Sequence, residues 1–298
     1  MGLTNFNPMA RRYTAGILKR LDKAGILKYF NFKLTNTYGN KRIAIPIINA
    51  IGYQLYTVSE KWATDLYEKL LKINPGTFVD VGANNGQTLL KIASFSKNLS
   101  YIGFEPNPSC FYYLKKLIDA NKFTGCNIFP VGLHYENKIT TLISDNDFAS
   151  GASVLQDFRE DITKFNIRQN VPLMKGDEIF EVLDNKMAVL KADLEGSELE
   201  VIKGLQQTIV RDAPFIVLEI LPVYSLAKKN GVYRKQRQDE LLEVLKQLGY
   251  LMYRIDESTG DLTPLKDIEV HNDIRKTNYL FAPAAQAEAV SKSFSVTA

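Results

Sequence analysis

Cysteine and histidine are scarce in this sequence, and long apolar runs are absent. The 298 residues include two cysteines and two histidines. Because Cys110 and Cys126 lack the paired spacing of a metal site, we expect a reduced protein, with the cytoplasm as its default compartment. No run approaches the roughly 18 apolar residues of a membrane span, and the first residues lack the apolar core and cleavage site of a signal peptide. The sequence therefore predicts neither a transmembrane segment nor a signal peptide.

An excess of charge of one sign is also lacking. There are 37 basic and 33 acidic residues, which give a formal net charge of +4. So small an excess does not indicate nucleic acid or an anionic membrane as a partner. The composition, 45% hydrophobic and 23% charged, is that of a globular protein. The length suits one large α/β domain with additions, or two domains.

The stretch 77–86 reads as a strand, a glycine turn and the start of a helix. Asp80 lies at the carboxyl end of the strand, where open α/β sheets place their sites. The turn has the spacing G-x-x-x-G between Gly82 and Gly86, because Asn84 replaces the middle glycine of the dinucleotide pattern. This departure favours S-adenosylmethionine (SAM) over a pyrophosphate. The alternative is a glycine turn that only closes a strand–helix unit.

Two further predicted strands end near residues that could bind a ligand or transfer a proton. The strand 99–104 is followed by Glu105, about twenty residues beyond the glycines, where a carboxylate would accept hydrogen bonds from ribose hydroxyls. The alternative role for Glu105 is to interact with the dipole of a helix that Pro108 begins. His134 lies near the end of the strand 127–134. It either shuttles a proton or satisfies a backbone group, and the second role is preferred.

The second informative stretch, 187–204, is an apolar strand that ends in charged residues and turns into a helix. Strand alternation places Lys191 and Asp193 on the same side, and a lysine in so apolar a strand is costly unless it is paired. Glu198 and Glu200 have simpler explanations. They suit the start of a helix, and Glu200 also fits a capping box with Ser197. The next strand, 215–220, carries another acid, Glu219.

The regions that flank these motifs predict additions to the domain. The segment 11–29 is basic and loosely amphipathic, and we expect a solvated helix pair, with a membrane-surface helix as the alternative. A strand or hairpin is expected over 41–51 and a helix over 63–72. The polar stretch 135–177 lacks clear periodicity and would make a lid or an acceptor wall.

The end of the chain predicts the last elements of a sheet. A helix is expected over 237–248, followed by an antiparallel pair formed by 250–255 and 277–282. The segment 256–276 then only connects the two strands. Residues 284–298 are rich in alanine and serine and predict a mobile tail.

Taken together, these motifs resemble the FkbM family of SAM-dependent methyltransferases. The resemblance runs from about Thr77 to Tyr250 and rests on the glycine turn, the acid after the second strand, the stretch 187–204 and the strand ending at Glu219. Ala192 stands where the family more often has a β-branched residue, a change that we expect to be harmless. The resemblance implies an α/β fold of the class I (Rossmann-like) type, with a mostly parallel seven-stranded sheet and helices on both faces.

The resemblance also implies which residues do the work. It implies a cofactor cradle formed by Asp80, Gly82, Asn84, Gly86, Glu105 and Asn107. It implies active-site roles for Asp193 and Glu195. In the class I strand order Asp80, Asp193 and Glu219 should converge, with Lys191 and the sulfonium of SAM as the candidate cations between them. Asp193 is the preferred general base, and Glu195 and His134 are the alternatives. Metal dependence stays open, with Asp193 and Glu219 as the ligands of a divalent ion if there is one.

The sequence therefore predicts a methyltransferase domain over 76–283, an N-terminal helical and β extension over 1–75, and a tail. The expected reaction is SAM-dependent O-methylation of a sugar, glycan or similar small-molecule hydroxyl. A nicotinamide-dependent oxidoreductase and a non-catalytic scaffold are the alternatives. Methylation of nucleobases is not expected, because Asp193 to Gly196 replaces the Asp/Asn-Pro-Pro-aromatic loop of such enzymes. Nucleic acid is not an expected partner, peripheral membrane contact through the basic N-terminus is a minor alternative, and the sequence does not indicate an oligomeric state.

Overall fold

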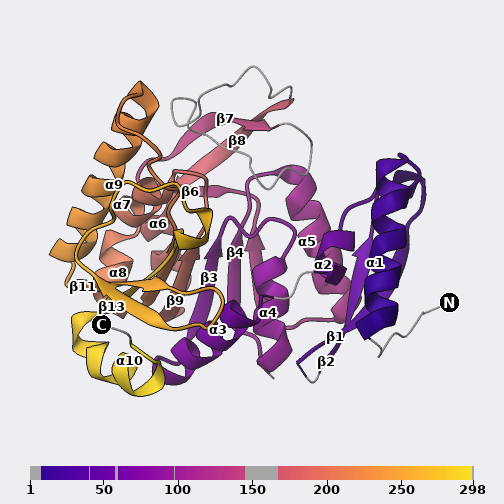
Figure 1. Ribbon diagram of the computed structural model, residues 1–298, viewed down its shortest axis with the longest axis horizontal. Helices are drawn as coiled ribbons and strands as arrows, with labels where there is room; N and C mark the ends of the chain where they lie inside the picture. The colour runs from indigo at the N-terminus through magenta and orange to yellow at the C-terminus, as the bar shows by residue number, and fades with distance from the viewer. Residues whose placement is uncertain (1–7, 40, 58–59, 97, 145–166, 297–298) are drawn as a thin grey trace.

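An eight-stranded sheet forms the centre of the molecule in the computed structural model, which describes residues 8–39, 41–57, 60–96, 98–144 and 167–296 (Figure 1). The strand order is β12-β11-β13-β10-β9-β3-β4-β5. The parallel strands are β3 (Thr77–Val81), β4 (Tyr101–Phe104), β5 (Cys126–Phe129), β9 (Met187–Ala192) and β10 (Phe215–Glu219). β13 (Asn278–Pro283) lies antiparallel between β10 and β11 (Tyr250–Ile255), and β12 (Leu262–Leu265) pairs antiparallel with β11 at the edge. The α/β class I fold and the antiparallel pair are thus confirmed.

The eighth strand corrects the predicted count of seven. Within the segment expected only to connect β11 and β13, β12 pairs with β11 at the edge of the sheet, where Ile255 lies opposite Leu262. The strand is four residues long and contains Pro264, which lacks an N–H donor and is tolerated at an edge. Its sequence is therefore hard to distinguish from a loop.

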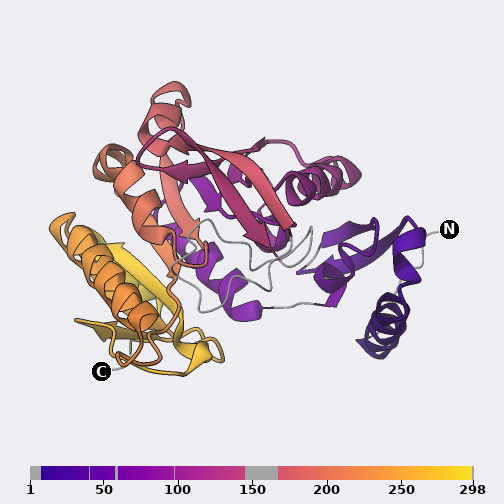
Figure 2. The ribbon, with the colours of Figure 1, turned by 90° about the horizontal axis from the view of Figure 1, so that it is seen from above.

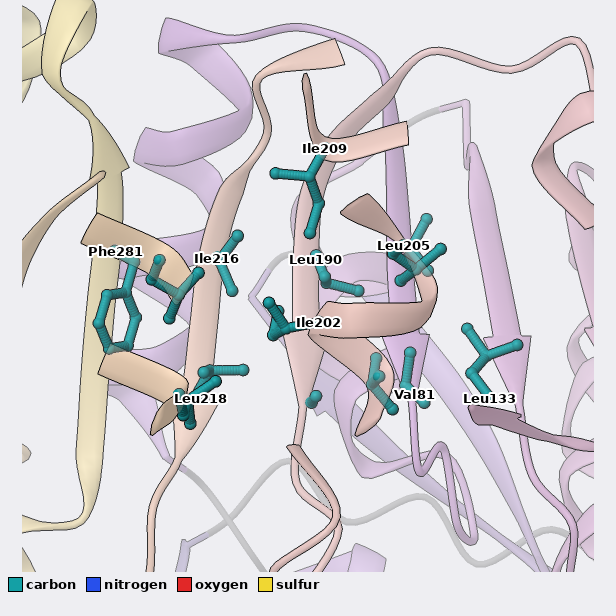
Figure 3. Close-up of a cluster of buried hydrophobic side chains, with 14 of the residues drawn as sticks. Val81, Leu133, Leu190, Ile202, Leu205, Ile209, Ile216, Leu218 and Phe281 are labelled. Carbon is teal, nitrogen blue, oxygen red and sulfur yellow. The ribbon is translucent and has the colours of Figure 1, made fainter. Parts of the chain in front are cut away.

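Helices cover both faces of the sheet because successive strand residues point to opposite sides (Figures 1 and 2). The helices of the sheet domain are α3 (Lys61–Ile73), α4 (Gln87–Phe95), α5 (Pro108–Asn121), α6 (Gly176–Val182), α7 (Glu198–Gly204), α8 (Gln206–Asp212) and α9 (Lys229–Gln247). On one face Val81, Leu190 and Ile216 pack against Ile202 and Ile209 of α7 and α8 (Figure 3). These apolar contacts hold the carboxyl ends of the strands in fixed positions.

The opposite face has its own apolar cluster. Phe78 of β3 and Val189 of β9 pack there against helices α3 and α4, including Leu66 of α3. The same side of each strand carries the polar residues Asp80 and Lys191 two positions further on, because the side-chain period of a strand is two. The polar residues of interest therefore lie at the carboxyl ends of the strands, on the face covered by α3 and α4.

The N-terminal extension consists of α1 (Pro8–Lys23), β1 (Phe32–Tyr38), β2 (Lys41–Ile47) and α2 (Tyr53–Thr57). A short 3-10 helix, η1, spans Leu27–Tyr29. The two strands form a separate antiparallel sheet that packs against α5, where the hydroxyl of Tyr113 donates to the carbonyl of Pro46 at 2.7 Å. The side chain of Asn121 both donates to and accepts from the backbone of Ala44. These contacts attach the extension firmly to one end of the sheet domain.

A second small sheet interrupts the alternation of strands and helices after β5. It contains β6 (Gly132–His134), β7 (Lys138–Ser144) and β8 (Ile167–Lys175), in the order β6-β8-β7. The single strand expected over 127–134 is therefore two strands in different sheets, separated by Pro130, which has no N–H for a ladder. The expected irregular stretch contains the hairpin of β7 and β8. Residues 145–166, the middle of the proposed lid, lie outside the described residues.

The expected helix near 237–248 is longer, since α9 begins at Lys229. The prediction of a mobile tail is wrong. After a 3-10 turn, η4 (Ala284–Gln286), residues Ala287–Ser293 form α10, and Val290 and Phe294 are buried in the cluster below α3. Val290 meets the core from the helix, and Phe294 does so from the extended residue directly after it. No helix in the described part of the chain is long and apolar enough to cross a membrane.

Candidate active site

Three neighbouring strands bring the predicted acids together. Because β10, β9 and β3 are adjacent, Asp80 lies opposite Lys191 and the end of β10 places Glu219 on the other side of β9. The ammonium of Lys191 lies 3.4 Å from Asp80 Oδ1 and 3.5 Å from Asp193 Oδ2. Burial alone lowers the pKa of Lys191, but these two carboxylates outweigh it and hold the pKa above its usual value. The expected pairing of the buried lysine is confirmed.

Asp80 is fully buried below this cluster. Its Oδ2 accepts a hydrogen bond of 2.6 Å from the hydroxyl of Tyr101. Gly103, which lies opposite Asp80, makes room for this contact, because a Cβ there would stand 2.9 Å from the Tyr101 ring. Sequence analysis missed Tyr101, and the signal was the glycine inside a strand, which often marks a close approach. Asp80 lines neither of the two cavities at the carboxyl ends of the strands, so its observed role is to hold Lys191.

Glu219 carries a raised pKa. Burial, followed by the charge of Asp193, raises the pKa of the Glu219 carboxyl to about 8. A hydrogen bond with Asp193 favours the protonated form further, and the hydroxyl of Thr277 lies 3.3 Å from Glu219 Oε1. At neutral pH Glu219 therefore holds a proton next to Asp193, and the two carboxyl groups together carry less negative charge than their number suggests.

The glycine turn contacts the loop after β9. At Gly82, where φ is +79°, a Cβ would lie 2.5 Å from the carbonyl oxygen of Asp193, so a side chain is not accommodated. Gly86 begins α4 beneath Leu114 of α5 and lines neither cavity. Asn84 adopts a left-handed conformation with φ of +47°. The close approach of the two loops places Gly82 and Asn84 beside Asp193.

Glu105 holds the turn from the next strand. Its carboxylate accepts the backbone N–H of Asn84 at 2.7 Å and that of Asn107 at 2.8 Å. Burial raises the Glu105 pKa to about 7, although the two backbone donors oppose this shift. Asn107 in turn caps α5, since its Oδ1 accepts from the backbone N–H of Ser109 at 2.9 Å. Glu105 thus has a structural function in addition to any contact with a ligand.

The loop 193–196 is held by Glu198 in a strained conformation. Glu195 has a φ of +54°, and Glu198 Oε1 accepts the backbone N–H groups of Leu194 and Gly196. The expected capping box is absent: in the described part of the chain the hydroxyl of Ser197 has no hydrogen-bond partner, and Glu200 forms an ion pair with Arg237 of α9. Tertiary contacts therefore replace the local cap.

His134 lies apart from the lysine cluster. Its Nδ1 accepts the backbone N–H of Glu136 at 3.0 Å, which is the preferred role from the sequence. Burial, followed by the charge of Lys138, lowers the pKa of His134. Among the described residues, no group of three or more His, Cys, Asp or Glu side chains is arranged to hold a metal ion. Both cysteines are free thiols.

Two cavities meet at the carboxyl ends of the strands. The smaller is lined by Gly82, Asn84, Glu105, Asn107, the segment 132–134, the segment 193–195 and Ser197, together with apolar residues. The larger has a volume of about 1020 Å³ and includes Lys191, Asp193 and Glu219 in its lining. Gly82, Asn84, Asp193 and Glu195 line both cavities. This arrangement can hold one ligand on each side of Asp193.

The model of the methyltransferase FkbM domain matches residues 80–252 of the chain. A solved methyltransferase FkbM from Methylobacillus flagellatus is similar at 16% identity and a TM-score of 0.42, over 69% of this chain and 43% of that one. A putative caffeoyl-CoA O-methyltransferase from Staphylococcus aureus is similar at 11% identity and a TM-score of 0.44, over 92% and 98%.

A further similar structure is fibrillarin from Aeropyrum pernix with bound SAM, at 9% identity and a TM-score of 0.39, over 86% of this chain and 83% of that one. The chain spans less than half of the Methylobacillus structure. No curated protein matches the sequence.

Proposed function

The chain belongs to the FkbM methyltransferase family, and from this premise we propose that it is a SAM-dependent O-methyltransferase that acts on a hydroxyl of a sugar, glycan or similar small molecule. The observation that carries the proposal is the meeting of two cavities at Gly82, Asn84, Asp193 and Glu195. Methyl transfer needs a cofactor and an acceptor side by side in a fixed orientation, and two joined cavities meet that need.

The lining of the smaller cavity suits the ribose end of SAM; its volume of about 80 Å³ holds only part of the cofactor, so in this proposal the rest of SAM extends past Gly82 and Asn84 into the larger cavity. Glu105 is a buried carboxylate in the lining of the smaller cavity, able to accept hydrogen bonds from ribose hydroxyls, and Gly82 leaves the backbone open to close approach. In this proposal Asn84 and Asn107 complete the cradle beside Glu105. When bound, SAM would supply an electrophilic methyl group for the acceptor oxygen, with S-adenosylhomocysteine as the leaving group. Asp80 and Gly86 contribute indirectly: Asp80 holds Lys191, and Gly86 forms the start of α4.

Asp193 is the proposed general base. It lines both cavities, its side chain is 40% exposed, and it lies at the point where an acceptor in the larger cavity would approach. Lys191 holds the Asp193 carboxylate in place, and the Glu219 carboxyl forms a hydrogen bond with it. Glu195 is the second candidate base, because it also lines both cavities. His134 lines only the smaller one, so it is the weaker candidate.

Binding and turnover test the proposal separately. We expect titration calorimetry to detect SAM and its demethylated product S-adenosylhomocysteine, and to detect no heat with NADH. Methyl-labelled SAM incubated with a panel of glycans should label a glycan hydroxyl, and the label should survive mild acid and base as an ether does. Binding of NADH without a response to SAM would contradict the cofactor assignment. Label found only on nitrogen would contradict O-methylation.

A further inference from the structure

About half of the lining of the larger cavity, 13 of its 25 described residues, lies outside the stretch matched by the family model. The N-terminal extension contributes Asp22, the turn 49–51 and Gln54, and the chain after β11 contributes Glu257, Ile274, Thr277 and Asn278. Figure 2 shows the extension and the C-terminal strands on opposite sides of the molecule, and the lining of the cavity includes residues of both. Its floor is formed by Lys191, Asp193 and Glu219 at the strand ends.

Carboxylates dominate the charge of this cavity. Its described lining contains two lysines and no arginine or histidine, against these six acids: Asp22, Glu60, Asp193, Glu195, Glu219 and Glu257. Both lysines are already paired, because Lys91 lies 2.6 Å from Glu60 and Lys191 lies between Asp80 and Asp193. Even with Glu219 protonated, acids outnumber bases. Among the described lining residues, a phosphate or carboxylate on the acceptor would meet like charge and no unpaired lysine.

The remaining polar groups suit hydroxyls. Six lining residues carry side-chain amides, which both donate and accept hydrogen bonds: Asn49, Gln54, Asn84, Asn85, Gln87 and Asn278. Trp62 and Tyr67 add aromatic surface. A volume of about 1020 Å³ lies at the upper end of the roughly 300–1,000 Å³ of small-molecule sites, so the cavity accommodates more than one sugar ring.

The turn of the extension that faces the cavity is strained. Asn49 and Ala50 are both left-handed, with φ values of +49° and +66°, and such a conformation is unusual for alanine. The turn is fixed by the Ile48–Ile51 bridge and by Asn31, whose Oδ1 accepts the backbone N–H of Asn49 at 3.1 Å. Strain of this kind persists where the surroundings impose it and is concentrated at ligand sites. It supports a recognition role for this wall.

We propose that the larger cavity takes an oligosaccharide acceptor without phosphate or carboxylate groups, and that the N-terminal extension and the segment after β11 select it. This proposal rests on the proposed methyl transfer, because it assigns the acceptor of the same site. Asp22 and Glu257 are the charged residues of the two walls, and they accept hydrogen bonds from Tyr53 and Asn278 respectively. Each carboxylate has further acceptor capacity for a sugar hydroxyl.

A glycan array tests the acceptor class without requiring turnover. Full-length protein saturated with S-adenosylhomocysteine is applied to uncharged, amino-bearing, carboxylated and phosphorylated oligosaccharides. We expect retention on uncharged or amino-bearing glycans. Retention only on anionic glycans, or on none, would overturn the proposal. If glycans without anionic groups are retained but never methylated, the acceptor class stands and the proposed function fails. If phosphorylated sugars are methylated, the proposed function stands and the proposed acceptor class fails.

Conservative variants then test whether the two walls of the larger cavity select the acceptor. The double variant Asp22→Asn, Glu257→Gln should weaken retention about tenfold or more, with SAM binding unchanged. The matched control is Glu181→Gln, an exposed position of α6, which should bind like the unmodified protein. Charge reversal to lysine at the same two positions should shift relative retention towards phosphorylated glycans. Folded double variants with unaltered retention and unaltered preference would show that these walls do not select the acceptor. The array result for the unmodified protein stands even if a variant fails to fold.

Discussion

Substitution of Asp193 by asparagine separates a catalytic role from a structural one. The carboxylate is 40% exposed, and its partner Lys191 keeps Asp80 at 3.4 Å after the change. Exposed ion pairs contribute about 0–1 kcal/mol, so we expect the free energy of unfolding to fall by less than about 1 kcal/mol. A removed general base costs about 10²–10⁴ in rate, which corresponds to about 2.7–5.5 kcal/mol of activation free energy. The rate should therefore fall far more than the stability.

Three measurements on the same preparation decide the outcome: melting temperature, SAM affinity by calorimetry, and single-turnover methyl transfer. Asp65→Asn is a matched control, because Asp65 is 51% exposed and pairs with Lys61 at 3.6 Å away from the cavities. Asp80→Asn is the opposite control, since breaking a buried pair costs about 3–5 kcal/mol. A stable Asp193→Asn protein with full activity would refute the assignment and leave Glu195 as the base to test. A loss of stability like that of Asp80→Asn would mean that Asp193 mainly neutralises Lys191.

Two further predictions concern pH. The Glu105 pKa is about 7, and in the proposed role its ionised form accepts the ribose hydroxyls, so SAM affinity should rise from about pH 6 to 8. Calorimetry of Glu105→Gln should show weaker binding with a flatter pH profile, whereas parallel profiles would contradict the role. The folded-state pKa of Glu219, about 8, lies above its usual value of 4.5, so its contribution to stability is complete below about pH 4.5 and is lost as pH rises through 8. Urea unfolding of Glu219→Gln should therefore show a smaller fall in stability between about pH 6 and 9 than the unmodified protein, and an equal fall would refute the raised pKa.

The local sequence pattern was sufficient to predict the central strands of the sheet and the acids at their ends. Alternation along β9 places Lys191 and Asp193 on one side, and adjacent parallel strands end at the same edge, so the convergence of Asp80, Asp193 and Glu219 followed from the sequence and the resemblance. The glycine turn was equally readable, because Gly82 and Gly86 occupy positive-φ positions that few other residues adopt. The roles of the site residues in binding and catalysis remain predictions.

Sequence analysis failed where the structure of a segment depends on contacts with segments far away in the sequence. Pro130 divides the strand predicted over 127–134 between two sheets, and β12 joins the main sheet although its four residues resemble a loop. The helix α10 forms because Val290 and Phe294 find an apolar surface below α3, which no pattern near the end of the chain reveals. Such choices depend on the surface that the rest of the fold offers.

The sequence by itself determined the order of strands, turns and acids in the sheet domain, because side-chain periodicity and glycine conformation act over a few residues. Only the tertiary structure brought Tyr101 to Asp80 and Glu105 to the backbone of Asn84. It also decided that the N-terminal extension lies beside the site and forms one wall of the larger cavity. The reason is that these contacts join residues 20 to more than 100 positions apart. Their geometry is set by packing across the whole fold, which no local pattern encodes.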